Sequence, residues 1–247
     1  MIHARNRDSE AISGILDAYL DYGVNAIMGP IGDAPDYFTN ALKQTEQRRG
    51  QEIIRIDTPT INVDDNDEAR GEARKLIEKA AKQGCKFCMP HHTRVEQLID
   101  KNKEKIRRIS DYLTMIRDAG MVPGFSAHMP EVILYSDANG YDVETYIQLF
   151  NCMGFLMQIE VETVARIIHE AKKPVMTIKP MAAGRVTPYV GLTFSFNAIR
   201  PVDMVTVGAF TPDEVHEDVE IARAAIERRY PNIEKRSSPA AAQSLLK

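Results

Sequence analysis

The fold is decided by two neighbouring stretches, Gly84-Cys-Lys-Phe-Cys-Met-Pro-His-His92 and Met121-Val-Pro-Gly-Phe-Ser-Ala-His128. Each reads as a short buried strand that runs directly into histidine. The charged segment between them, residues 94–118, is predicted to form one long helix. Strand, helix and parallel strand make a βαβ unit, and the carboxyl ends of such strands carry the functional side chains of a barrel. Three of the six histidines are therefore expected on one rim of a parallel sheet: His91, His92 and His128.

Strand and helix patterns alternate along the rest of the chain, with short links between them. The remaining predicted strands cover residues 24–29, 52–58, 145–151, 174–180 and 204–208. This alternation predicts an α/β fold, a closed (β/α)8 TIM barrel whose first strand is short or missing. Ile2-His-Ala is the candidate remnant of that strand.

One barrel domain is expected over residues 1–230, followed by a C-terminal tail at 231–247 that is rich in Pro, Ser and Ala. A barrel without its first strand has an open edge. The tail or a second subunit would cover such an edge, so the sequence raises the prospect of a homo-oligomer.

Composition narrows the classes of partner. With 44% hydrophobic and 27% charged residues and a formal charge of −4, the chain lacks the basic surface that nucleic acid or an anionic membrane would require. No apolar run reaches the roughly 18 residues of a membrane span, and residues 1–8 do not resemble a signal peptide. Three cysteines indicate reduced thiols and a cytoplasmic location. Cys85 and Cys88, three apart in a strand, are expected on opposite faces as buried core residues rather than as a redox or zinc pair.

Several segments carry a family resemblance. Gly124-Phe-Ser-Ala-His-Met-Pro130 is similar to a G-V-S-N-H-S-P segment, Tyr146-Ile-Gln-Leu-Phe-Asn151 to a Q-x-x-Y-N strand, and residues 173–184 to I-P-V-I-A-Y-S-P-L-A-x-G. All three patterns are those of the aldo/keto reductases. The resemblance implies their TIM barrel and extends over well more than half of the chain.

The catalytic set of that family is largely unmatched. The family has an aspartate after its second strand, where this chain has Met28, and no lysine stands in the region of the third strand. Only the family histidine has a counterpart, at His91 or His92. The resemblance therefore implies a shared barrel with a different site.

The nicotinamide site is altered as well. Ile178 replaces the tyrosine that stacks on the nicotinamide ring in this family, and Ala127 replaces the asparagine that holds its carboxamide, although Ser126 and Gln148 match. NADPH is therefore not expected as a cofactor.

The residues at the predicted rim suggest metal binding. Imidazole and carboxylate groups from adjacent strands can hold a divalent ion such as Zn, Mn or Fe. The alternative is that the histidines serve as polar rim residues or proton shuttles. The candidate ligands are Asp57, His91, His92 and His128.

Lys179 follows a predicted strand and is framed by Ile178 and Pro180. Apolar neighbours favour the neutral amine that a Schiff-base or proton-transferring lysine needs. The alternative is a lysine in a salt bridge across the barrel mouth. Its strand face, shared with Val175 and Thr177, is expected to point into the barrel.

The segments that follow the last three predicted strands contain candidates for binding a substrate or phosphate. Glycine turns and helix N-termini at these places in a barrel often hold phosphate. These candidates are Gln148, Asn151, Gly184, Arg185, Gly208 and Thr211.

These features favour an enzyme that acts on a small anionic or carbonyl compound at the barrel mouth. Its acid–base groups would be the three rim histidines, with Asp57 as an orienting group and Lys179 as an electrophile or base. Isomerase, lyase and metal-assisted hydrolase chemistry all remain open. Two alternatives remain: a divergent NADPH oxidoreductase, and a barrel that binds or scaffolds without catalysis.

Overall fold

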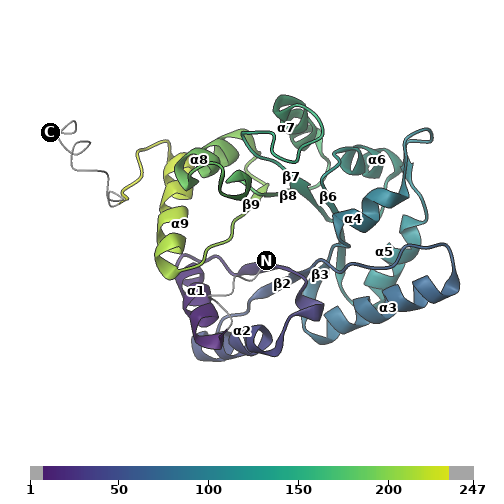
Figure 1. Cartoon of the computed structure of the whole chain (residues 1–247), viewed down its shortest axis with the longest axis horizontal. Helices are drawn as coiled ribbons and strands as arrows, with labels where there is room; N and C mark the ends of the chain where they lie inside the picture. Colours follow the sequence, from purple (N-terminus) through teal and green to yellow (C-terminus); the bar gives the residue numbers. More distant parts are fainter. Residues whose placement is uncertain (1–7, 234–247) are drawn as a thin grey trace.

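A computed structural model describes residues 8–233 as a curved sheet of seven parallel strands, nearly closed into a barrel (Figure 1). Its order is β1-β2-β3-β6-β7-β8-β9, so neighbouring strands of the sheet follow one another along the chain and β1 and β9 form its edges. The TIM-barrel prediction is thereby confirmed. The strands are β1 (Ala26–Gly29), β2 (Ile54–Asp57), β3 (Cys85–Cys88), β6 (Val122–Ala127), β7 (Thr145–Leu149), β8 (Val175–Ile178) and β9 (Met204–Thr206).

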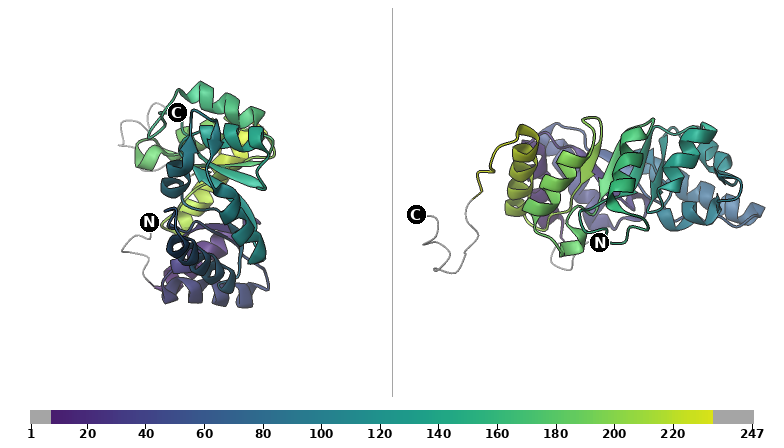
Figure 2. Two further views of the ribbon diagram at one scale, coloured as in Figure 1. Left: turned by 90° about the vertical axis from the view of Figure 1, so that its right-hand side faces the viewer. Right: turned by 90° about the horizontal axis from the view of Figure 1, so that it is seen from above.

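Helices surround this sheet on its outer side, as the three views show (Figures 1 and 2). Several begin at side-chain caps that satisfy free N–H groups of the first turn. Thr211, for example, accepts a hydrogen bond from the Glu214 N–H at 3.2 Å, with Pro212 at the first helical position. The long helices are α1 (Ser9–Asp21), α2 (Asp36–Arg49), α3 (Asp67–Lys82), α5 (Ile109–Asp118), α6 (Glu131–Asn139), α7 (Val161–Glu170), α8 (Pro188–Ala198) and α9 (Pro212–Glu227).

Two apolar layers lie on opposite faces of the sheet. A small cluster built on Ile56, Met89, Ile147 and Met176 fills the barrel interior. A much larger cluster packs the outer face of the sheet against the helices. Because both faces of the sheet are covered by these clusters, apolar side chains lie on both sides of the strands.

The segment between the two histidine strands differs from its prediction. It contains a short helix α4 (His92–Val95), a 3-10 turn η3 (Glu96–Leu98) and an antiparallel hairpin of β4 (Ile99–Asp100) and β5 (Lys105–Ile106) before α5 begins. The single helix over 94–118 is therefore wrong. Residues 100–105 contain no apolar side chain, so a helix there would have no face to bury.

Two strands place polar side chains on the outer face of the sheet, and the predicted inward facing of Val175 and Thr177 is wrong. Arg55 on β2 donates to the Gln83 carbonyl at 2.8 Å and pairs with Glu46, both in the helix layer, so Arg55 and Asp57 face outward and not into the barrel. On β8, Val175 belongs to the outer cluster and Met176 to the interior one, so Thr177 also faces outward.

Cys85 and Cys88 are both buried, as predicted, but on one side of the sheet. Both belong to the outer cluster, because β3 carries an extra residue opposite the Arg55–Ile56 step of β2. Such a bulge reverses the alternation of side chains. Burial raises the pKa of the Cys85 thiol to about 12, so neither residue is placed as a reactive thiolate.

The sheet is open between β1 and β9, which do not pair with each other in the described part of the chain. A largely apolar cavity of about 480 Å³ lies there, between the two edge strands and α1. The predicted first strand, Ile2-His-Ala, falls outside the described residues. No helix within residues 8–233 has the length and hydrophobicity to cross a membrane.

Candidate functional site

Three histidines form one cluster at the carboxyl ends of β3 and β6. The ring centroids of His91 and His92 are 4.3 Å apart, and those of His92 and His128 are 3.6 Å apart, with the latter two rings nearly parallel at 13°. His91 and His92 follow β3, and His128 follows β6. The predicted meeting of the three side chains at one rim is therefore confirmed.

Glu96 holds the cluster together and was not predicted. Its Oε1 accepts hydrogen bonds from the His128 N–H at 2.5 Å and the Met129 N–H at 2.9 Å, and its Oε2 lies 3.5 Å from His92 Nδ1. The side chain is only 16% exposed. The spacing of His92 and Glu96, four residues apart on a helical turn, was a signal that the sequence offered.

Gln148 fixes the other side of the His128 peptide. Its Nε2 donates to the His128 carbonyl at 3.2 Å and to the Leu149 carbonyl at 3.1 Å, and the residue is 1% exposed. The backbone N–H and the carbonyl of His128 are thus held by the half-buried Glu96 and the buried Gln148. Such support fixes the position of the His128 backbone at the rim.

The cluster favours neutral imidazole. Burial, helped by the charges of His92 and Lys179, lowers the pKa of His128 to about 4. Burial also lowers the pKa of His91, with His92 the next cause. The Glu96 carboxylate opposes both shifts but does not outweigh burial. His128 is therefore uncharged at neutral pH and can accept a proton.

Lys179 reaches the same rim. It directly follows β8, and its positive charge contributes to the lowered pKa values of both His91 and His128. Within residues 8–233 no carboxylate lies within ion-pair distance of it, so the salt bridge across the barrel mouth that was the alternative for this lysine is not formed there. Lys179 was expected to share a strand face with Val175 and Thr177. Its backbone φ of 60° is not that of a strand, so the alternation of side chains along β8 does not extend to it.

The turn after β8 is unusual. Lys179, Ala182 and Ala183 have φ values of 60°, 49° and 56°, in the left-handed region. Each costs a residue with a Cβ on the order of 1–3 kcal/mol, and such positions gather at functional sites. The turn is held by bonds such as that from the Ala182 N–H to the Lys179 carbonyl at 2.9 Å.

Asp57 does not join the histidines. It lies on the outer face of β2, where its Oδ1 accepts from the Gly32 N–H at 3.0 Å, and it is 1% exposed. Burial raises its pKa, although backbone N–H groups of Gly32 and Ile31 oppose the shift. Its role is to hold the turn η2 (Ile31–Asp33) against the sheet.

The predicted metal set of Asp57, His91, His92 and His128 is therefore not assembled. The His91 Nδ1 lies 2.9 Å from the Thr93 hydroxyl, and His92 and His128 stack face to face instead of converging on one point. No three His, Cys, Asp or Glu side chains in the described residues are arranged to hold a metal ion. These residues do not fit a shared divalent ion in this arrangement.

The predicted binding residues fall into two groups. In the first group each residue supports the fold. The Asn151 side chain hydrogen-bonds to the backbone of Phe155, Thr211 caps α9, and Gly208 lines the apolar cavity. The second group is Gly184 and Arg185, in the turn after β8. Arg185 is exposed, and its guanidinium lies 3.9 Å from the centroid of the Phe155 ring.

No known family model and no curated protein sequence matches this chain. Solved structures do match its fold. A protein from Pseudomonas aeruginosa described as an aldo-keto reductase aligns at 15% identity over 89% of this chain and 85% of its own, with a TM-score of 0.65. The holo form of an aldo-keto reductase from Bacillus halodurans gives 12% identity over 94% and 91%, with a TM-score of 0.58.

An N-acetylmannosamine-6-phosphate 2-epimerase from Clostridium perfringens also aligns, at 15% identity over 86% of this chain and 85% of its own, with a TM-score of 0.51. The likeness confirms the TIM-barrel fold. At these identities it establishes the fold that TIM-barrel enzymes share, and the function has to be argued from the site.

Proposed function

We propose that this protein is a lyase or isomerase that acts on a small carbonyl compound, with Lys179 forming an imine and the rim histidines moving the proton. The observation that supports the proposal most strongly is the histidine cluster beside Lys179. It combines a base with a pKa of about 4, His128, and an amine without a carboxylate partner in the described residues.

The proposed chemistry balances without a cofactor. The neutral Lys179 amine adds to the carbonyl carbon, water leaves, and one proton taken up from solvent gives the protonated imine. The cationic nitrogen withdraws electrons from the adjacent C–H or C–C bond. The neutral imidazole of His128 accepts the proton that is released, and return of a proton followed by hydrolysis of the imine frees the product.

Arg185 is the proposed partner for an anionic group of the substrate. It stands on the turn that follows Lys179, and the Phe155 ring and the Ala182 carbonyl, 3.2 Å from its NH1, hold its side chain. A guanidinium held in this way can bind a carboxylate or phosphate in bidentate fashion. The substrate class is therefore a carbonyl compound that carries one acidic group.

Reductive trapping tests the imine. We expect borohydride, added with pyruvate, glycolaldehyde or dihydroxyacetone, to leave a covalent adduct on the peptide that contains Lys179. Mass mapping should show this adduct in the parent and in Lys75→Ala, which removes an exposed lysine of α3. Lys179→Met should lose it. Labelling spread evenly over the surface lysines would contradict the proposal.

The alternative functions would give different results with the same protein. The first alternative is an oxidoreductase that uses NADPH, because aldo-keto reductases share this fold. Such a protein would bind NADPH and form no adduct. A barrel that only binds or scaffolds would form no adduct and bind neither NADPH nor a carbonyl compound. The residues at the nicotinamide positions, with Ile178 beside the barrel interior, favour the imine enzyme over the reductase.

A further inference from the structure

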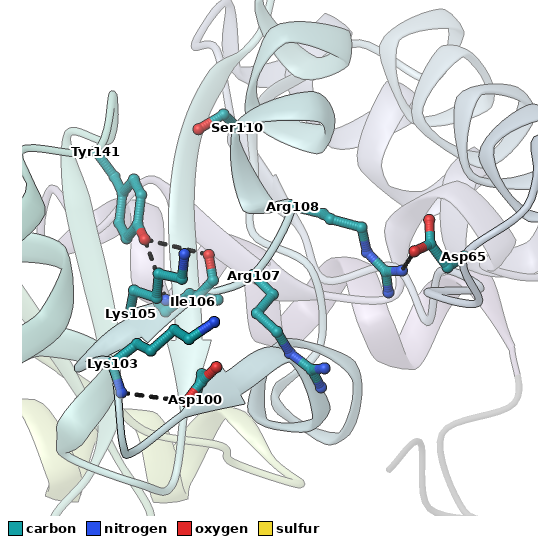
Figure 3. A pocket seen from close by; sticks show the side chains of 9 residues that line it. All are labelled: Asp65, Asp100, Lys103, Lys105, Ile106, Arg107, Arg108, Ser110 and Tyr141. Carbon is teal, nitrogen blue, oxygen red and sulfur yellow. Dashed lines mark hydrogen bonds and ion pairs between the residues drawn. The ribbon is translucent and has the colours of Figure 1, made fainter.

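A second cleft lies on the hairpin between the histidine cluster and α5. It has a volume of about 450 Å³, within the range of small-molecule sites. Tyr141 stands at one end and the Arg108–Asp65 ion pair at the other (Figure 3). Its lining residues are Asp65, Asp100, Lys103, Lys105, Ile106, Arg107, Arg108, Ser110 and Tyr141.

The positive charge of this cleft is not balanced. Four of the nine lining residues are cationic and two are acidic. Asp65 is engaged by Arg108 and Arg70, whose hydrogen bonds lower its pKa. In the described chain, no carboxylate lies within ion-pair distance of Lys103, Lys105 or Arg107. Three positive charges are therefore available to a ligand in one cleft.

The backbone beside these side chains also favours an anion. Helix α5 has ten residues, and no side chain caps its N-terminus; Arg108, the cap residue, has a left-handed φ of 55°. Free N–H groups and the positive end of the helix dipole attract negative charge. Glu104, which stands between the lining residues Lys103 and Lys105, has a φ of 49°, so a second strained residue with a Cβ lies in the hairpin.

The hairpin is held rigidly. The Tyr141 hydroxyl donates to the Ile106 carbonyl and accepts from its N–H, both at 3.1 Å. Asn139 donates to the Glu104 carbonyl at 2.8 Å, and Lys101 pairs with Glu131 at 2.6 Å. These contacts fix the hairpin to α6 and to Tyr141 beyond it, so the backbone that carries Lys103 and Lys105 is held in place before a ligand arrives.

We propose that this cleft binds a phosphate-bearing small molecule that carries two or more negative charges. Several convergent cations beside a helix N-terminus suit phosphoryl oxygens, which accept more hydrogen bonds than a single carboxylate. The site is separate from the histidine cluster and does not depend on the proposed imine chemistry.

Calorimetric titration of the full chain with pyrophosphate tests the site. We expect one pyrophosphate per chain, and an increase in Kd of at least about tenfold in Lys103→Ala and in Arg107→Ala. Lys75→Ala, which removes one positive charge from an exposed part of α3, should change Kd less than about twofold. Citrate, a tricarboxylate, should bind more weakly than pyrophosphate.

The titration has clear outcomes that would overturn the proposal. They are the absence of binding, equal loss of affinity in Lys75→Ala and Lys103→Ala, and equal affinity for citrate, which would show general charge attraction only. His128→Ala should leave the affinity for pyrophosphate unchanged; a loss there would assign the anion to the histidine rim instead. The two tests are independent. Absence of pyrophosphate binding would not bear on the trapping of Lys179, and absence of trapping would not bear on pyrophosphate binding.

Discussion

Replacing His128 by alanine is expected to slow the exchange of solvent deuterium into a bound carbonyl compound by about 10²–10⁴-fold, the contribution of a positioned general base. The reason is the lowered pKa of His128, about 4, which keeps its imidazole ready to accept a proton at neutral pH. The measurement is the loss of the proton signal beside the carbonyl group of pyruvate or dihydroxyacetone in D2O, followed by NMR.

His169→Ala is the matched control for this result. His169 lies on α7, where its Nε2 is 3.0 Å from the Ala198 carbonyl, away from the rim cluster. This variant should exchange at the rate of the parent. Equal rates in the His128 and His169 variants, or a parent no faster than buffer, would argue against the histidine rim as a site of proton transfer.

Replacing Gly191 by alanine is expected to destabilise the protein by about 1–3 kcal/mol, the usual cost of overpacking. A Cβ at Gly191 would lie 2.5 Å from the Pro180 oxygen and 2.9 Å from its carbonyl carbon, both backbone atoms that cannot rotate away. Helix α8 would have to move away from the turn after Lys179. At roughly 2–4 °C per kcal/mol for a chain of this size, thermal unfolding should show a clear fall in Tm.

Gly71→Ala provides the comparison. Gly71 lies within α3 and its added Cβ would have no atom within 4 Å. That change should stabilise the helix by about 0.5–1 kcal/mol, the difference in helix propensity between the two residues. A Gly191→Ala protein as stable as the parent would show that α8 does not pack closely on the Pro180 turn.

The barrel could be predicted from the sequence because each strand and helix start is marked by residues that are close together in the chain. Parallel strands buried on both faces read as short apolar runs, and caps such as Thr211-Pro-Asp-Glu214 mark helix starts. The hairpin at 99–106 was missed because two-residue strands leave almost no periodicity. It lies inside a charged segment that resembles a surface helix.

The candidate site was predicted only in part. The meeting of His91, His92 and His128 followed from the geometry of parallel strands. The facing of Asp57 did not, because a strand buried on both sides gives no sign of which face is the interior. The bond from the His128 N–H to Glu96 joins residues 32 positions apart, so no local spacing rule could reveal it.

The most direct test of the central claim is NMR of histidine ring nitrogens in the full chain, with assignments from single variants. We expect His128 to be neutral at pH 7. Pyruvate or dihydroxyacetone should shift the signals of the rim histidines and leave those of His169 and His216 in place. A charged His128 at pH 7, or rim signals that move only when NADPH is added, would contradict the account.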